Sequence, residues 1–154
     1  MKSINQWLSE YGESHQNPTN KKVHFVCVPV IFFTVVGLLY CIKLPFNFAP
    51  GHAVTAAHIA LLFTAVYYSL LSIPLAIGMV LYGVGCLFLC YEIDTAPYQL
   101  LLVSISLFVL AWIAQFWGHK VEGKKPSFLK DLQYLMIGPA WIMSFLFKKI
   151  GLSV

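Results

Sequence analysis

Residues 99–122 read QLLLVSISLFVLAWIAQFWGHKVE, and this stretch joins a membrane span to a cluster of polar side chains. Residues 99–117 carry no charged side chain and are long enough to cross a hydrocarbon core about 30 Å thick. Across the end of this run, Gln115, His119 and Glu122 follow one another at spacings of four and three, which places them on one face of a helix. The segment therefore predicts a transmembrane helix that ends in a polar stripe.

Three more apolar runs, at residues 25–42, 53–71 and 74–91, precede this helix, and each has a length suited to a membrane span. The chain is 59% apolar and only 10% charged, whereas a soluble domain has about 25% charged residues. We therefore predict an all-α integral membrane bundle of about four transmembrane helices, formed as a single domain over residues 1–154.

Both ends of the chain are predicted to lie at the membrane surface. Near the N-terminus, Ser3 and Gln6 have the spacing of a helix capping box, and an amphipathic stripe of apolar residues follows. We expect a short interfacial helix there. The last apolar run, residues 134–147, is too short to span comfortably and carries Gly138-Pro139 at its middle. We expect it to form a re-entrant or interfacial hairpin.

The positive charges of the chain indicate its orientation. All ten basic residues are lysines, and the four-span layout places nine of them on one face and Lys43 alone on the other. Because basic residues accumulate on the cytoplasmic side, we predict that the lysine-rich face is cytoplasmic. The protein would be a multi-pass protein of a bacterial inner membrane or the endoplasmic reticulum. This orientation explains the net charge of +4, which does not indicate a nucleic-acid partner.

A second polar segment, residues 11–24 (YGESHQNPTNKKVH), lies just before the first apolar run. Four crossings separate it from the polar stripe, and an even number of crossings returns both segments to the same face of the membrane. His15, His24, His119 and Glu122 would then meet at that face. Ionisable groups at this depth are costly, which favours a functional site. Each segment alone would also suit a hydrogen-bonded cap on the helix bundle.

This set of side chains is suited to a metal ion. Imidazoles with one carboxylate form the open facial site of non-haem Fe(II) oxygenases, and zinc accepts similar ligands. We predict His15, His24, His119 and Glu122 as metal ligands and catalytic residues. The neighbouring residues expected to orient these ligands are Tyr11, Asn17, Asn20 and Gln115.

Other classes of membrane protein also agree with the composition. A small transporter would need internal repeats and polar residues near the middle of the bilayer, and the spans show no convincing repeat. A non-catalytic membrane scaffold predicts that removing His24 or His119 leaves the metal content unchanged. A zinc-dependent lipid hydrolase would use a similar ligand set and differ from an iron enzyme in the metal it holds.

The two polar segments resemble those of a known family, the Mpo-like membrane proteins, which are iron(II)-dependent 2-hydroxy fatty acid dioxygenases. The resemblance extends over nearly the whole chain. It rests on Tyr11, His15, Asn17, Pro18, Asn20, His24 and Pro29 in the first block, and on Gln115, Phe116, Gly118, His119, Glu122, Lys124, Lys125 and Pro126 in the second.

This resemblance implies an Fe(2+) cofactor, O2 and a long-chain 2-hydroxy fatty acid as substrates, and oxidative α-cleavage to a fatty acid one carbon shorter. A 2-hydroxy acid can chelate iron through its hydroxyl and carboxylate while its tail stays among the helices in lipid. Nearby lysines would each favour the substrate carboxylate by about 1 kcal/mol, although Lys124 and Lys125 would serve equally well as orientation signals. The lysines in question are Lys21, Lys22, Lys120, Lys124 and Lys125. The sequence leaves open whether copies of the chain form a homo-oligomer.

Overall fold

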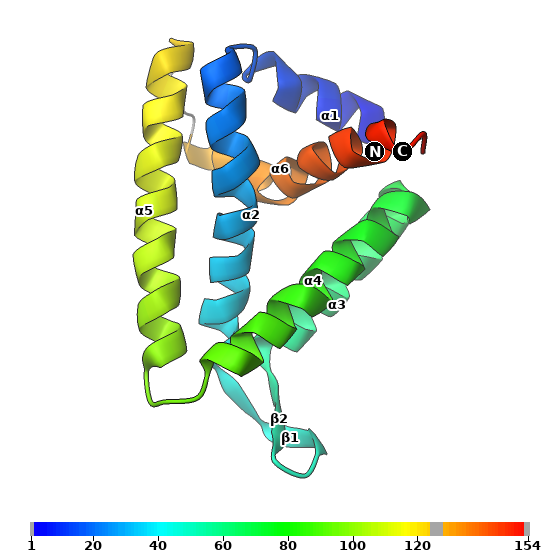
Figure 1. The fold of residues 1–154 in the computed structure, drawn as a ribbon. Helices are drawn as coiled ribbons and strands as arrows, with labels where there is room; N and C mark the ends of the chain where they lie inside the picture. Colours follow the sequence, from blue (N-terminus) through cyan, green and yellow to red (C-terminus); the bar gives the residue numbers. More distant parts are fainter. Residues whose placement is uncertain (1, 124–127, 153–154) are drawn as a thin grey trace.

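The computed structural model describes residues 2–123 and 128–152, and over this part of the chain the fold is a bundle of helices with one small hairpin (Figure 1). This confirms the predicted all-α class. The elements in chain order are α1 (Ile4–Glu13), α2 (Pro18–Tyr40), β1 (Lys43–Ala49), β2 (His52–Thr55), α3 (Ala56–Leu71), α4 (Ile73–Ile93), α5 (Gln99–Glu122) and α6 (Phe128–Lys149).

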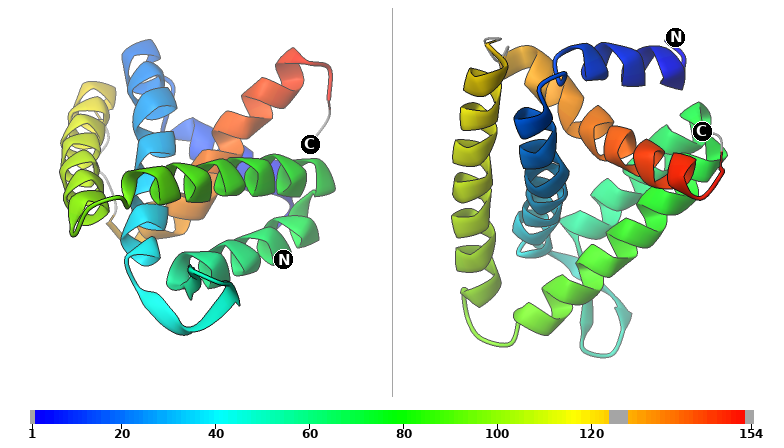
Figure 2. Two further views of the ribbon diagram at one scale, coloured as in Figure 1. Left: turned by 60° about the horizontal axis from the view of Figure 1, so that its bottom comes forward. Right: turned by 45° about the horizontal axis from the view of Figure 1, so that its top comes forward.

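Helices α2 and α5 lie side by side, with α2 in the middle of the bundle and α5 at its edge (Figures 1 and 2). Two glycines allow this close approach, because small residues let transmembrane helices pack backbone against backbone. A Cβ atom at Gly118 of α5 would lie 2.6 Å from Asn20 Oδ1, and one at Gly37 of α2 would collide with the Ser104 hydroxyl. The two contacts lie at opposite ends of α2, so they hold the helices together along their length.

Helices α3 and α4 form a second antiparallel pair, tilted away from α2 and α5 (Figure 1). Two tyrosine hydroxyls attach this pair to the rest of the bundle. Tyr68 of α3, which is fully buried, donates a hydrogen bond to the backbone carbonyl of Met136 in α6. Tyr82 of α4 donates to the carbonyl of Pro29 in α2 at 2.8 Å. A buried phenol needs such a partner, so both contacts fix where the pair docks.

Four helices run back and forth, so the start of α2 and the end of α5 lie at the same end of the molecule (Figure 1). Helices α2, α4 and α5 are long and apolar enough to cross a membrane. The predicted second span is partly wrong, because residues 53–55 belong to β2, where Thr55 pairs with Lys43 of β1. Helix α3 therefore has only 16 residues, about 24 Å of helix at 1.5 Å per residue.

Helices α1 and α6 cover the end where α2 begins and α5 ends (Figure 2). The predicted N-terminal helix is confirmed, with the Ser3–Gln6 capping box formed. The predicted C-terminal hairpin is wrong, since α6 is one continuous helix that contains Pro139. Gly138 passes so near α1 that an added Cβ would lie 3.1 Å from the Tyr11 hydroxyl. Neighbouring elements therefore pack around the proline, which is how such a residue is tolerated within a helix.

Candidate metal centre

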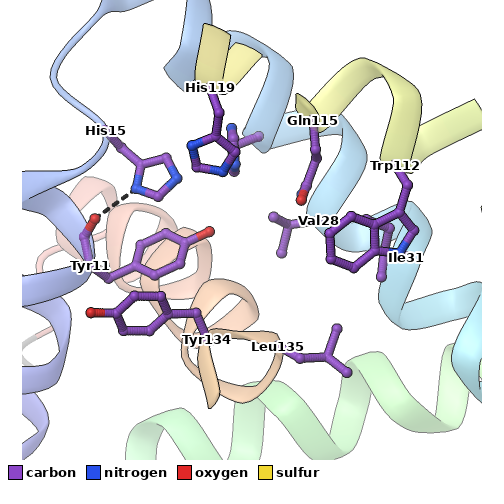
Figure 3. Close-up of a pocket in the computed structure, with 10 residues that line it drawn as sticks. Tyr11, His15, Val28, Ile31, Trp112, Gln115, His119, Tyr134 and Leu135 are labelled. Atoms are coloured by element: carbon purple, nitrogen blue, oxygen red, sulfur yellow. Dashed lines mark hydrogen bonds between the residues drawn. The ribbon is translucent and has the colours of Figure 1, made fainter. Parts of the chain in front are cut away.

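Three histidines converge beneath α1, at the end of the α2–α5 pair. His15 comes from the loop after α1, His24 from the second turn of α2, and His119 from the last turns of α5. All three are buried, and their potential ligand atoms lie within 4.8 Å of one another. Figure 3 shows the His15 and His119 rings side by side, with centroids 5.4 Å apart. The even number of crossings thus brings the two polar segments together as predicted.

Backbone carbonyls orient two of the imidazoles. His15 Nδ1 lies 2.6 Å from the carbonyl oxygen of Tyr11, and His24 Nδ1 lies 3.0 Å from that of Asn20. A carbonyl can only accept, so each Nδ1 carries the proton and each Nε2 keeps its lone pair. Tyr11 also stacks on His15, with ring centroids 4.2 Å apart and planes inclined by 14°. Tyr11 and Asn20 therefore orient the histidines, as expected, but they do so through their backbone carbonyls.

The carboxylate of Glu122 is engaged away from the three imidazoles. Its two oxygens accept hydrogen bonds from the backbone N–H groups of Gln16 and Asn17, both at 2.9 Å, and from Asn20 Nδ2 at 3.0 Å. These three donors tie the end of α5 to the loop that carries His15 and to the first turn of α2. The structure therefore brings Glu122 to the site but does not place it among the grouped ligand atoms.

The local sequence around Asn17 explains why α2 begins where it does. Asn17 is the N-cap, and its side-chain oxygen accepts hydrogen bonds from the backbone N–H groups of Thr19 at 2.8 Å and Asn20 at 3.4 Å. Pro18 occupies the first turn, where its missing N–H costs nothing. The side chain of Asn17 therefore caps α2, where a contact with an imidazole was expected, and this cap sets the position of His24 about two turns further on.

A cavity of about 30 Å³ lies next to the histidines (Figure 3). Its volume suits a small ligand group, on the order of one or two water molecules. One end of the cavity is polar and the other is apolar. The polar lining comes from Tyr11, His15, His24, Gln115, His119 and Tyr134, and the apolar lining from Val28, Ile31, Trp112 and Leu135.

Gln115 lines this cavity but contacts no imidazole through a hydrogen bond in the described part of the chain. The expected lysines lie further out. Lys22 and Lys120 are exposed, Lys21 is half-buried, and no lysine is among the described residues that line the cavity. The predictions for Lys124 and Lys125 fall outside the described residues.

Sequence reasoning missed the aromatic walls of the site. Trp141 of α6 is buried, and its ring centroid lies 5.5 Å from that of His15. No motif marks it, because α6 meets α1 only in the folded molecule. Trp112 could have been found, since Trp112, Gln115 and His119 recur at spacings of three and four and so share one helix face.

The donor set agrees with a first-row divalent metal. Neutral imidazoles held by backbone carbonyls are the common protein ligands of iron and zinc. Three histidines leave coordination positions for substrate or water, as in catalytic sites. The residues present therefore fit Fe(II) or Zn(II), and the cavity supplies space for a ligand beside the metal.

Comparisons with known proteins find relatives of this chain. A family model described as 2-hydroxy-palmitic acid dioxygenase Mpo1-like matches residues 1–150. The 2-hydroxy-palmitic acid dioxygenase MPO1 of Saccharomyces cerevisiae is 32% identical to this chain over 146 residues, which are 92% of this chain and 78% of the relative. No solved structure matches the chain.

Proposed function

This chain belongs to the Mpo1-like family of 2-hydroxy-palmitic acid dioxygenases, and from that membership we propose that it is an iron(II)-dependent membrane dioxygenase acting on long-chain 2-hydroxy fatty acids. The product would be a fatty acid one carbon shorter. The reaction balances when the 2-hydroxy acid and O2 give the shortened acid, CO2 and water, with O2 reduced by four electrons. The observation that carries the proposal is the group of three buried histidines whose potential ligand atoms lie within 4.8 Å of one another beside a cavity, two of them oriented through Nδ1 by backbone carbonyls.

His15, His24 and His119 would hold the iron, and iron bound there would supply the activation of O2. Tyr11 and Asn20 keep two of the imidazoles in the tautomer that binds metal. Glu122 we assign to positioning, because three N–H donors already occupy its carboxylate. Its negative charge still lies close enough to the centre to favour a cation.

The shape of the cavity supports an amphiphilic substrate. On α2 the lining runs from His24 to Ile31, about 10 Å along a helix axis. The polar head of a 2-hydroxy acid would lie among the imidazoles, and its tail would leave through the apolar end towards lipid. Because the cavity holds only a small group, most of the tail would lie outside it.

Charge on the outer surface supports the same orientation. Lys22 and Lys120 are exposed near the metal centre and would attract the substrate carboxylate to this end of the bundle. Lys43 lies at the opposite end, in β1. We propose that the metal centre faces the cytoplasm, in a bacterial inner membrane or the endoplasmic reticulum, because lysines accumulate on the cytoplasmic side.

The direct test is turnover of 2-hydroxypalmitate by protein purified without oxygen and loaded with Fe(II). We expect a C15 fatty acid to form when O2 is admitted, and no product from protein treated with a chelator. Iron-loaded, folded protein that leaves 2-hydroxypalmitate unchanged would contradict the proposal.

Zinc-dependent lipid hydrolysis is a second candidate, favoured by one observation. Three histidines with an open position also form a typical catalytic zinc site, and no carboxylate joins the grouped ligand atoms of the described residues. Metal analysis of the protein as isolated separates the two. Zinc at one per chain, with ester hydrolysis and no C15 product, would favour the hydrolase.

A further inference from the structure

Gln115 presents its carboxamide to the cavity beside the three histidines. Its side chain is only 8% exposed and lines the cavity one helical turn before His119 on the same face of α5. It forms no hydrogen bond with any residue of the segments 2–123 and 128–152. Figure 3 shows it pointing from α5 into the space beside Val28.

The amide atoms of Gln115 are not among the fully enclosed polar atoms of the described residues that lack a partner, so they reach the space of the cavity itself. Asn20, the other buried carboxamide of the site, donates to Glu122 and to the Ser14 carbonyl. Its own side-chain oxygen is enclosed against Gly118 and does not face the cavity, so its role is structural. Val28, on the wall beside Gln115, is apolar, so a leucine or methionine at position 115 would pack there without leaving a polar group unpaired. A carboxamide that faces a cavity without a protein partner calls for an explanation, and a ligand in the cavity supplies one.

We propose that Gln115 binds the polar head of the substrate and selects acids that carry a 2-hydroxyl group. This inference rests on the proposed function and extends it to substrate recognition. A carboxamide presents a donor and an acceptor side by side. A 2-hydroxy carboxylate presents the matching pair, since its hydroxyl donates and its carboxylate accepts.

Close analogues lack this match. An unsubstituted fatty acid has no hydroxyl to donate, and a 2-oxo acid offers only acceptors. Each would leave the carbonyl of Gln115 unpaired in a buried site, and sites of this kind discriminate strongly against a substrate that lacks the hydrogen-bonding group. The position of Gln115 agrees with this role, because it stands between His119 and the apolar lining, where the head of the acid meets its tail.

The test measures binding without turnover. Iron-loaded protein in lipid nanodiscs is titrated without oxygen with 2-hydroxypalmitate, 2-oxopalmitate and palmitate, and binding is followed by tryptophan fluorescence, since Trp112 lines the cavity. The three acids have the same chain length, so their partition into the membrane largely cancels in the comparison. We expect wild-type protein to prefer 2-hydroxypalmitate over palmitate by about tenfold to a hundredfold, as expected for two hydrogen bonds.

The variant Gln115→Leu should lose most of this preference by weakening 2-hydroxypalmitate binding, while palmitate binding and iron content stay within about twofold of wild type. Gln115→Asn keeps the carboxamide one methylene further back and should keep part of the preference. Ser104→Ala is the matched control, because Ser104 is also a buried polar residue of α5 but lies three turns away from Gln115.

The outcomes separate this inference from the proposed function. One outcome is that wild type forms the C15 product while Gln115→Leu keeps the full preference for 2-hydroxypalmitate. In that case Gln115 does not recognise the 2-hydroxyl group, and only the inference is overturned. If Gln115→Leu loses its iron while Gln115→Asn keeps the full preference, the residue supports the metal site instead, and the inference is also overturned. If wild type shows no preference and no product, both fail together.

Discussion

Histidines stand at both ends of this bundle, but only one end has the features of a metal centre. At the hairpin end, His58 Nδ1 is engaged by Thr55, at 3.1 Å from its backbone nitrogen and 2.9 Å from its hydroxyl, where it caps α3. His52 lies half-buried between the rings of Phe48 and Tyr91, with centroids 5.6 and 5.7 Å away. At the other end, Nδ1 of both His15 and His24 meets a backbone carbonyl, so Nε2 is left to bind.

Judged by the volume of its cavity, the hairpin end would instead be the stronger candidate for a binding site. The cavity at the hairpin end measures about 640 Å³, and it is lined by Lys43 and Asp94, which neutralise each other in an ion pair of 2.7 Å. The cavity at the histidine cluster measures about 30 Å³. Burial and the orientation of the imidazoles therefore distinguish the candidate metal centre, whereas the volume of the cavity does not.

The largest expected effect comes from removing one histidine at each end. His24→Ala should reduce the iron content from nearly stoichiometric to nearly zero and abolish the C15 product, because the proposed metal centre would lose one of its three potential ligands. His58→Ala should keep iron and activity and lose only about 1 kcal/mol of stability as a lost helix cap. Metal analysis and product assay on both proteins check this. Equal iron loss in the two variants would remove the distinction between the ends.

The next largest effect is expected from a variant at the contact between α2 and α5, which tests how closely these helices must pack at the site. Gly118→Ala would place a Cβ atom 2.6 Å from Asn20 Oδ1 and 3.3 Å from Val23 Cγ1, so α5 must move outward and carry His119 with it. We expect activity to fall about a hundredfold, as it does when a reacting group is displaced by about 1 Å.

Gly85→Ala is the matched control, because nothing lies within 4 Å of the added atom among the described residues. It should leave both iron content and turnover unchanged. Activity in Gly118→Ala close to that of Gly85→Ala would show that the contact between the helices does not set the geometry of the site.

Glu122→Gln separates a positioning role from a ligand role. One carbonyl oxygen remains to accept hydrogen bonds, but the charge is lost, so we expect activity to fall about tenfold with iron retained. The free energy of unfolding should fall by about 1–3 kcal/mol, because one backbone N–H loses its acceptor. Loss of iron without loss of stability would identify Glu122 as a ligand. Glu10→Gln, which breaks only the exposed pair with Lys2, is the control.

The smallest expected effect concerns surface charge at the two ends. Lys22→Gln should raise the KM for 2-hydroxypalmitate by about fivefold at low salt, since one cationic side chain near the membrane contributes about 1 kcal/mol. The difference should shrink as salt is added. Lys43→Gln, at the hairpin end, should leave the KM unchanged. A similar change in both variants would mean that the charge near the metal centre does not guide the substrate.

Much of the helical framework was predictable from local patterns. The Asn17-Pro18 pair and the Ser3–Gln6 box are formed as helix starts, because capping depends on neighbours along the chain. The hairpin β1–β2 was missed because its residues read as a loop and the beginning of an apolar run. Pro139 suggested a break in the last helix, but packing against Tyr11 and Val28 keeps that helix continuous.

The sequence by itself determined that His15, His24 and His119 share one end of the bundle, because apolar run length and an even number of crossings fix on which side each segment emerges. Only the tertiary structure decided what the surrounding polar groups do. The Glu122 carboxylate accepts hydrogen bonds from backbone N–H groups of the loop that carries His15, whereas Gln115 faces the cavity with no hydrogen bond to the residues that the structure describes. Helix spacing shows which residues share a face, whereas hydrogen-bond partners depend on how closely two helices approach, which here is set by glycines such as Gly118.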